Sequence, residues 1–269
     1  MIPQTTHKLD EFFLAFSASS QPFLLLDYDG TLAPFQLDRF QAYPWDGVRE
    51  RLAAIQGQGR TRMRIITGRP AEEIRPLLGL DPPLEVWGLH GAERLHSDGR
   101  RELEQASPQV QKALEKLRET LRRDSFGGLF EDKANGAVMH WRGTSPEDAK
   151  RIEIEARRLF EPLARMEGLS LLEFESGIEL RVGRDKGHAI QAILAEAQDP
   201  AAAPVAFLGD DITDEAAFHA VRRLDRPNLT ALVRPEWRET EAELWFHPPE
   251  ELNAFLDLWL HTLGIVGVR

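Results

Sequence analysis

The chain has 269 residues, of which 42% are hydrophobic and 29% charged, a composition that supports a full core and differs from that of disordered chains. At this length we expect one large domain or two modest ones. The formal net charge of −11 argues against a nucleic-acid partner, because the phosphate backbone is also negative. The chain has no cysteine, which excludes disulfides, thiolate catalysis and cysteine metal sites.

The first twenty residues predict an amphipathic helix and not a targeting segment. Their apolar run, residues 12–16, is short and follows two acids, Asp10 and Glu11. A signal peptide would begin with basic residues and have a longer apolar stretch. No run elsewhere approaches the length of a membrane span. We therefore expect a cytoplasmic protein with no membrane partner, and we favour a monomer.

Strands that alternate with helices predict a doubly wound parallel sheet of the Rossmann type, with α/β topology. Before residue 103, the predicted elements are strands at 23–26, 64–70 and 84–93 and helices at 48–58 and 71–78. After residue 183, they are helices at 185–197, 214–221 and 249–263 and strands at 204–211 and 230–233.

The pattern changes between these two parts, where one helix and two strands occur twice in succession. The predicted elements here are helices at 110–122 and 146–166 and strands at 128–132, 136–141, 169–174 and 178–182, with turn residues at 134–136. We interpret residues 103–183 as an inserted α+β domain. Residues 1–102 and 184–269 then form one discontinuous core domain.

Two aspartates follow the first predicted strand, separated by a single residue. Asp27 and Asp29 come after four apolar residues and precede a glycine and a threonine. The carboxyl end of such a strand is where open α/β sheets bind ligands. Two close carboxylates repel each other unless one is protonated or a cation lies between them. The pair therefore suits a bound Mg²⁺, with one aspartate as nucleophile and the other as acid/base. The alternative is an ordinary turn, since Asp-Gly is a common turn pair.

Polar groups of complementary kinds follow the other predicted strands or open a helix. Thr67 follows the second strand, Lys186 opens a helix, and Asp210, Asp211 and Asp214 follow the strand at 204–211. Taken singly, these could be a strand end, a surface lysine and a helix cap. Together they match the needs of phosphoryl transfer: an attacking carboxylate, oxygen ligands for Mg²⁺, and a hydroxyl and an ammonium to neutralise the phosphoryl oxygens.

These segments resemble the four motifs of the haloacid-dehalogenase (HAD) superfamily of phosphohydrolases. The matching residues, in order, are Asp-Tyr-Asp-Gly-Thr at 27–31, Thr67, Lys186 and Gly-Asp-Asp-Ile-Thr-Asp-Glu at 209–215. The inserted region lies between the second and third motifs, where α/β-cap members of that superfamily carry their cap. More narrowly, residues 27–34, 90–93, 185–187 and 209–215 are similar to trehalose-6-phosphate phosphatases. The resemblance covers essentially the whole chain.

The resemblance implies a Mg²⁺-dependent phosphatase that converts trehalose 6-phosphate to trehalose and phosphate through an aspartyl phosphate. Asp27 would be the nucleophile and Asp29 the general acid/base, while Thr67 and Lys186 would hold phosphoryl oxygens. The implied metal ligands are the side chains of Asp27 and Asp210, the backbone carbonyl of Asp29, and Asp214 and Asp211 in support.

The resemblance also implies residues that bind the sugar. The candidate substrate-binding residues are Arg69, His90, Glu131, Lys133, His140, Arg142 and Glu179. Alternation places the pairs 131/133 and 140/142 each on one face of a strand, and such a face could equally be a solvated salt-bridge surface. His90 could be an ordinary packed histidine. We expect the inserted domain to close as a cap over the active site.

The sequence departs from the family at two positions and leaves other functions open. Thr67 stands where the family usually has serine, which preserves the hydroxyl, and Gly183 stands where it tends to have proline. The alternatives are a phosphatase of another sugar phosphate (sucrose, glucosylglycerol or mannosylglycerate phosphate), a sugar phosphomutase, or a non-catalytic partner of a sugar-phosphate synthase.

Overall fold

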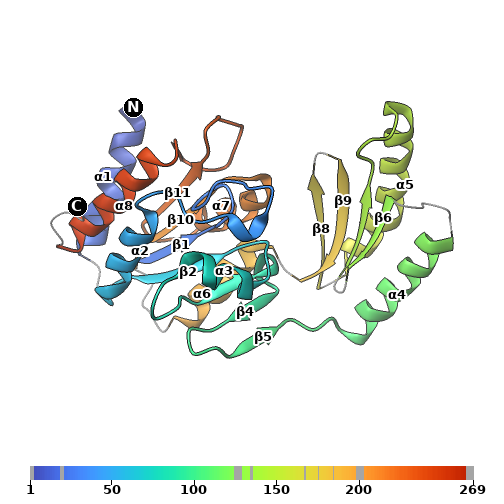
Figure 1. The fold of residues 1–269 in the computed structure, drawn as a ribbon, viewed down its shortest axis with the longest axis horizontal. Coiled ribbons are helices and arrows are strands. Elements are labelled where there is room, and N and C mark those ends of the chain that lie inside the picture. Colours follow the sequence, from blue (N-terminus) through green and yellow to red (C-terminus); the bar gives the residue numbers. More distant parts are fainter. Residues whose placement is uncertain are drawn as a thin grey trace. The chain divides into compact units, whose positions relative to one another are not determined.

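The computed structural model describes residues 3–18, 21–123, 129–133, 136–166, 168–174, 176–183, 185–197 and 203–264 (Figure 1). The chain divides into two compact units. The first unit is formed by Met1–Glu102 together with Asp185–Arg269, and the second unit by Leu103–Arg184. Each unit has a hydrophobic core of its own.

The first unit is built on an eight-stranded sheet. Its strands, in spatial order, are β12 (Leu244–Phe246), β11 (Asn228–Val233), β10 (Val205–Gly209), β1 (Phe23–Leu26), β2 (Arg62–Ile66), β3 (Val86–Gly88), β4 (Glu93–Leu95) and β5 (Arg101–Leu103). Neighbouring strands from β12 to β3 run parallel. The chain winds from β1 outward to β3 and later from β10 outward to β12, so its direction reverses between β1 and β10. The predicted doubly wound α/β fold is confirmed.

Helices cover both faces of this sheet because its strands are apolar on both sides. Leu24 and Leu26 pack with one cluster of core residues, whereas Phe23 and Leu25 pack with another. The first face carries α1 (Pro3–Ser17), α2 (Val48–Gly57), α3 (Ala71–Leu78) and α8 (Glu250–Thr262); the second carries α6 (Lys186–Glu196) and α7 (Glu215–Arg222). Among the described residues, no helix is both long and apolar enough to cross a bilayer.

The strand predicted at 84–93 is wrong in its extent. The structure ends β3 at Gly88, turns through a short 3-10 helix at Leu89–Gly91, and begins β4 at Glu93, antiparallel to β3. The turn has a local cause: Leu89 (φ 50°) and His90 (φ 57°) adopt the left-handed conformation, which reverses the chain. The short strands β4, β5 and β12 were not predicted.

The second unit is a four-stranded antiparallel sheet with two helices on one face. The strand order is β6 (Phe130–Lys133), β7 (Gly136–His140), β9 (Gly177–Val182) and β8 (Leu169–Phe174), and the helices are α4 (Pro108–Arg123) and α5 (Pro146–Ala164). Leu114 and Leu117 of α4 and Phe160 of α5 pack with Met139 and Ile178 of the sheet. The predicted strand start at residue 128 and the turn residues 134 and 135 lie outside the described residues.

An aromatic cluster packs α1 against α8 in the first unit. The rings of Phe16 and Trp259, on α1 and α8, lie 4.6 Å apart between centroids, and Phe12 and Phe255 each lie 5.9 Å from Trp259. The amphipathic helix predicted near the N-terminus is therefore present, and its apolar face is part of the core.

We expect Phe16→Ala to lower the free energy of unfolding by about 3–5 kcal/mol, because it leaves a cavity against Trp259 in a buried cluster. Leu14→Ala on the same helix is the matched control, since that side chain is 75% exposed and should change stability by less than about 0.5 kcal/mol. Urea unfolding measures both. Equal losses would show that α1 does not dock through this face.

Candidate active site

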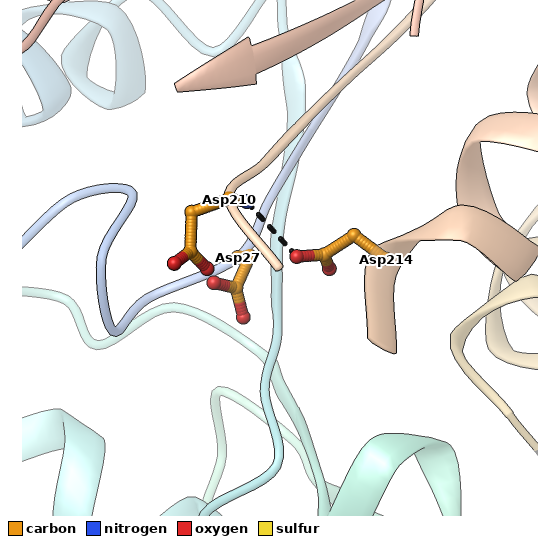
Figure 2. A group of neighbouring side chains, drawn as sticks. All are labelled: Asp27, Asp210 and Asp214. Carbon is orange, nitrogen blue, oxygen red and sulfur yellow. Dashed lines mark hydrogen bonds between the residues drawn. The ribbon is translucent and has the colours of Figure 1, made fainter. Parts of the chain in front are cut away.

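Two aspartates lie side by side where the winding direction of the sheet reverses. Asp27 directly follows β1 and Asp210 directly follows β10, and the two strands pair in parallel with Leu26 opposite Leu208. The Asp27 amide donates to the Leu208 carbonyl at 2.9 Å, so the pairing extends to the base of the first carboxylate. Figure 2 shows the two carboxylates next to each other, with Asp214 across from them. Open α/β sheets bind ligands at this kind of crevice.

Lys186 brings a buried positive charge to these aspartates from the first residue of α6. Asp185 caps that helix by accepting a hydrogen bond from the His188 amide, which fixes where the helix begins. The Lys186 ammonium donates to Asp27 Oδ1 at 2.6 Å and to Asp214 Oδ1 at 2.7 Å. Burial disfavours the ammonium charge, but the two carboxylates outweigh that effect and raise the pKa of Lys186. Lys186 is therefore a permanent cation within the site.

The Asp214 carboxylate has hydrogen-bond partners on both oxygens. Besides the Lys186 contact at Oδ1, its Oδ2 accepts from the backbone amides of Asp210 and Asp211 at 2.9 and 3.0 Å. The Asp211 side chain turns to the backbone instead, where it accepts from the Ile212 amide at 2.7 Å and caps the 3-10 helix Ile212–Asp214. Asp214 thus orients the loop that carries Asp210, whereas Asp211 lies outside the buried group.

Asp27, Asp210 and Asp214 form a buried cluster of carboxyl groups. One carboxylate oxygen from each of Asp27, Asp210 and Asp214 lies within 4.8 Å of the other two, and all three residues are buried. Burial raises the pKa of Asp27 to about 7, with Lys186 lowering it and Asp214 raising it. Burial, followed by the charges of Asp27 and Asp214, raises the pKa of Asp210 to about 10. Three buried carboxyl groups facing one ammonium cannot all be ionised without a further cation, and their hard oxygens fit a divalent ion.

A tight turn after β1 places Thr31 beside Asp27, with the hydroxyl Oγ1 donating to Asp27 Oδ2 at 3.1 Å. Gly30, in this turn, has φ +82°, and a Cβ added there would lie 2.0 Å from Asp210 Oδ2. Both the left-handed backbone and the contact with Asp210 therefore require glycine at this position.

Asp29, two residues beyond Asp27, contacts Arg69 and lies outside the group of carboxylates around Asp27. Arg69 Nη1 donates to Asp29 Oδ1 at 3.3 Å, and 27% of the Asp29 side chain is exposed. Burial raises the pKa of Asp29, against the opposing effect of Arg69. A partly exposed carboxyl with a raised pKa is suited to proton transfer.

Thr67 and His90 lie next to each other beyond β2. Thr67 directly follows this strand and is buried, and its Oγ1 accepts from the Arg69 amide at 3.2 Å. The His90 amide donates to the Thr67 carbonyl at 2.8 Å. The His90 ring packs against Gly68, where an added Cβ would lie 2.6 Å from ring atoms Cε1 and Nε2. Because β2 neighbours β1, Thr67 lies at the same edge of the sheet as Asp27.

Four predicted sugar-binding residues share the face of the second unit's sheet that points away from its helices. They are Glu131, Lys133, His140 and Glu179. They form two ion pairs: Lys133 Nζ with Glu179 Oε2 at 3.1 Å and His140 Nε2 with Glu131 Oε2 at 2.9 Å. Arg142, just beyond β7, donates through Nε to Ser176 Oγ at 3.2 Å.

Three residues at the core site were not singled out from the sequence. Thr31 lay inside the recognised motif, but its bond to Asp27 depends on the turn geometry. Glu73, in the first turn of α3, pairs with Arg69, which lies just before that helix begins at Ala71, so no helical periodicity marked the pair. Arg238 donates through Nε to the Asp210 carbonyl at 3.4 Å from a loop beyond β11, and no local pattern marked it.

Comparisons with known proteins identify relatives of this chain. A family model described as trehalose-phosphatase matches residues 25–244. A trehalose-phosphate phosphatase of Mycobacterium marinum is 30% identical over 221 residues, which are 79% of this chain and 54% of that protein. A trehalose-6-phosphate phosphatase-related protein of Thermoplasma acidophilum is 32% identical over 200 residues, which are 73% of this chain and 81% of that protein. The chain therefore spans about half the length of the mycobacterial relative.

Solved structures share the fold. A trehalose-6-phosphate phosphatase of Aspergillus fumigatus superposes with a TM-score of 0.76 at 24% identity, covering 95% of this chain and 97% of that one. A phosphatase of the haloalkanoate (HAD) enzyme superfamily from Bacteroides thetaiotaomicron superposes with a TM-score of 0.60 at 18% identity, covering 91% and 96%.

We expect Asp210→Asn to stabilise the protein when divalent cations are removed by EDTA. The pKa of Asp210 is about 10 in the folded protein against 3.8 for an ordinary aspartate, so the folded state holds an extra proton between these values. Stability in EDTA then falls as pH rises through this window, and asparagine avoids that loss. At pH 8 the variant should melt at least about 2 °C above the wild type, and at pH 4 the difference should vanish.

Added Mg²⁺ should raise the melting temperature of the wild type and leave that of Asp210→Asn nearly unchanged, because binding to the folded state alone stabilises it. An Asp210→Asn variant that melts below the wild type in EDTA at pH 8 would contradict the raised pKa of Asp210.

Proposed function

The chain belongs to the trehalose-phosphatase family, and we propose that it hydrolyses trehalose 6-phosphate to trehalose and inorganic phosphate. The observation that carries this proposal is the buried ion pair of Asp27 with Lys186, beside Asp210 at the reversal point of the sheet. A carboxylate, a fixed ammonium and a cation-binding carboxylate form the minimum set for attack on a phosphoryl group. That activity also fits the names of the similar proteins.

In the first step, an oxygen of Asp27 attacks phosphorus in line with the departing sugar. The bond from phosphorus to the sugar oxygen breaks, and its electron pair stays on that oxygen. Asp29 donates its carboxyl proton to the same oxygen, and trehalose leaves. The raised pKa of Asp29 favours the protonated form that this step needs. The product on the protein is an acyl phosphate at Asp27.

In the second step, a water oxygen attacks phosphorus while the Asp29 carboxylate takes a proton from that water. The bond between phosphorus and the Asp27 oxygen breaks, which releases inorganic phosphate and restores both carboxyl groups to their starting states. Lys186 and the Thr67 hydroxyl stabilise the negative charge on the phosphoryl oxygens during both steps.

The residues around Asp27 would hold Mg²⁺, through the side chains of Asp27 and Asp210 and the backbone carbonyl of Asp29. Asp214 would orient these ligands, since its two oxygens already bind Lys186 and backbone amides. When bound, Mg²⁺ screens the repulsion between the attacking carboxylate and the phosphoryl oxygens.

The charged face of the second unit would recognise the sugar. Sugar hydroxyls both donate and accept hydrogen bonds, and the pairs Lys133–Glu179 and His140–Glu131 offer charged donors and acceptors on one face. The second unit would thus act as the cap domain for substrate recognition. The predicted cytoplasmic location and monomeric state stay predictions.

The direct test is release of inorganic phosphate from trehalose 6-phosphate, with and without Mg²⁺, beside sucrose, glucosylglycerol and mannosylglycerate phosphates. We expect kcat/KM to be highest for trehalose 6-phosphate and EDTA to abolish turnover. Asp27→Asn should lower kcat by at least about 10⁴-fold, as loss of a nucleophile does, with the circular-dichroism spectrum unchanged. Preference for another sugar phosphate would reassign the substrate, and conversion to an isomeric sugar phosphate without phosphate release would indicate a mutase.

We expect Lys133→Ala to raise KM for trehalose 6-phosphate about tenfold with little change in kcat, because it removes a charge-assisted hydrogen bond that binds substrate and transition state alike. Lys150→Ala, at an exposed position of α5 in the same unit, is the matched control for the lost charge. Equal KM values for the two variants would indicate that the charged face is a solvated salt-bridge surface and does not bind the sugar.

A further inference from the structure

We propose that Glu73 is a positioning residue for this reaction, which acts through Arg69 to hold the Asp29 carboxyl where the leaving sugar oxygen must be protonated. The inference rests on the proposed function and concerns a residue of α3 that lies outside the recognised motifs. Its basis is a set of contacts that link Glu73 of α3 and Arg69 to Asp29 in the turn after β1 and to Arg39 in the 3-10 helix Arg39–Gln41.

Arg69 is the side chain that holds the Asp29 carboxylate. Its Nη1 donates to Asp29 Oδ1 at 3.3 Å and to the Arg39 backbone carbonyl at 2.8 Å. Only 9% of the Arg69 side chain is exposed, so its guanidinium depends on protein partners for its orientation. A long arginine side chain left to itself samples several rotamers, and these two contacts hold only Nη1, so the opposite edge of the guanidinium needs a partner of its own.

Glu73 contacts the opposite edge of the Arg69 guanidinium. It lies four residues after Arg69, in the first turn of α3, and its Oε2 accepts from Arg69 Nε at 3.2 Å and pairs with Nη2 at 3.1 Å. Because the guanidinium is a rigid plane, fixing the Nε and Nη2 edge also fixes the direction of Nη1 toward Asp29. The second Glu73 oxygen, Oε1, pairs with Arg39 Nη2 at 2.8 Å, so both oxygens are in use and 12% of the side chain is exposed.

The consequence for catalysis concerns the leaving group. A sugar alkoxide is a poor leaving group and needs the Asp29 proton, whereas p-nitrophenolate leaves readily without one. The ratio kcat/KM covers only the steps up to release of the leaving group, so it reports proton donation and omits the later attack by water. Misplacing Asp29 should therefore slow the sugar phosphate much more than p-nitrophenyl phosphate.

The test compares Glu73→Gln with Glu72→Gln, the same change at the exposed neighbouring residue. Glutamine keeps the size of Glu73, but its amide N–H faces a guanidinium N–H at one of the two contacts. We expect Glu73→Gln to lower kcat/KM for trehalose 6-phosphate by about 10- to 100-fold and for p-nitrophenyl phosphate by less than about threefold. Glu72→Gln should change neither value.

A double-mutant cycle tests whether the effect passes through Arg69. In an Arg69→Ala background, Glu73→Gln should cause no further loss of kcat/KM, because the side chain through which it acts is gone. Arg39→Ala, which removes the exposed partner of Glu73 and leaves the Arg69 pair, should cost less than about threefold. Melting temperatures within a few degrees of the wild type show that each variant is folded.

Equal losses for the two substrates, or full additivity in the cycle, would overturn the inference. These outcomes are separate from failure of the proposed function. If the wild type releases no phosphate from trehalose 6-phosphate, the proposed function fails. If the wild type is active but Glu73→Gln leaves the ratio between the two substrates unchanged, only the role of Glu73 fails.

Discussion

The first unit depends on one interaction, the buried contact of the Lys186 ammonium with Asp27 and Asp214. Removing two carboxylates and an ammonium from water is costly, and the cost is offset only when the charges meet with good geometry. At 2.6 and 2.7 Å, Lys186 satisfies one oxygen of each carboxylate. The same contact joins α6 to Asp27 after β1 and to Asp214 in the loop after β10. Pairing these buried charges therefore also brings the parts of the site together.

The Asp210 carboxyl group lowers the stability of the folded protein but suits the site to binding a cation. Among the residues that the structure describes, no cationic side chain pairs with the Asp210 carboxylate, and burial together with its neighbours drives its pKa far above the ordinary value. A protein selected for stability alone would place an uncharged residue there. Gly30 shows the same compromise, because its backbone conformation and its closeness to Asp210 exclude any side chain. Function at this edge of the sheet therefore comes at the expense of stability.

The sequence predicted the parts of the fold that depend on local patterns. Apolar runs identified β1, β2 and β10, and the helix predicted at 71–78 matches α3 (Ala71–Leu78). The strand at 84–93 was predicted too long because left-handed conformations at Leu89 and His90 have no signature in residue type. At the site, motif residues could be named, but Arg238 reaches the Asp210 carbonyl from 28 residues away, and Glu73 lies near Asp29 only through the contact of Arg69 with both. Their roles depend on tertiary contacts that one sequence does not reveal.

The position of the inserted segment bears on the order in which the molecule is made. β1 occupies the middle of its sheet, yet its neighbour β10 begins only at Val205, after the whole of Leu103–Arg184 has been synthesised. The ribosome therefore completes the second unit before it synthesises β10, and the edge of β1 that pairs with β10 stays unpaired until then. Such long-range parallel pairing forms slowly and exposes an aggregation-prone edge. Chaperone demand during synthesis should therefore concentrate on the interval before residue 205 emerges.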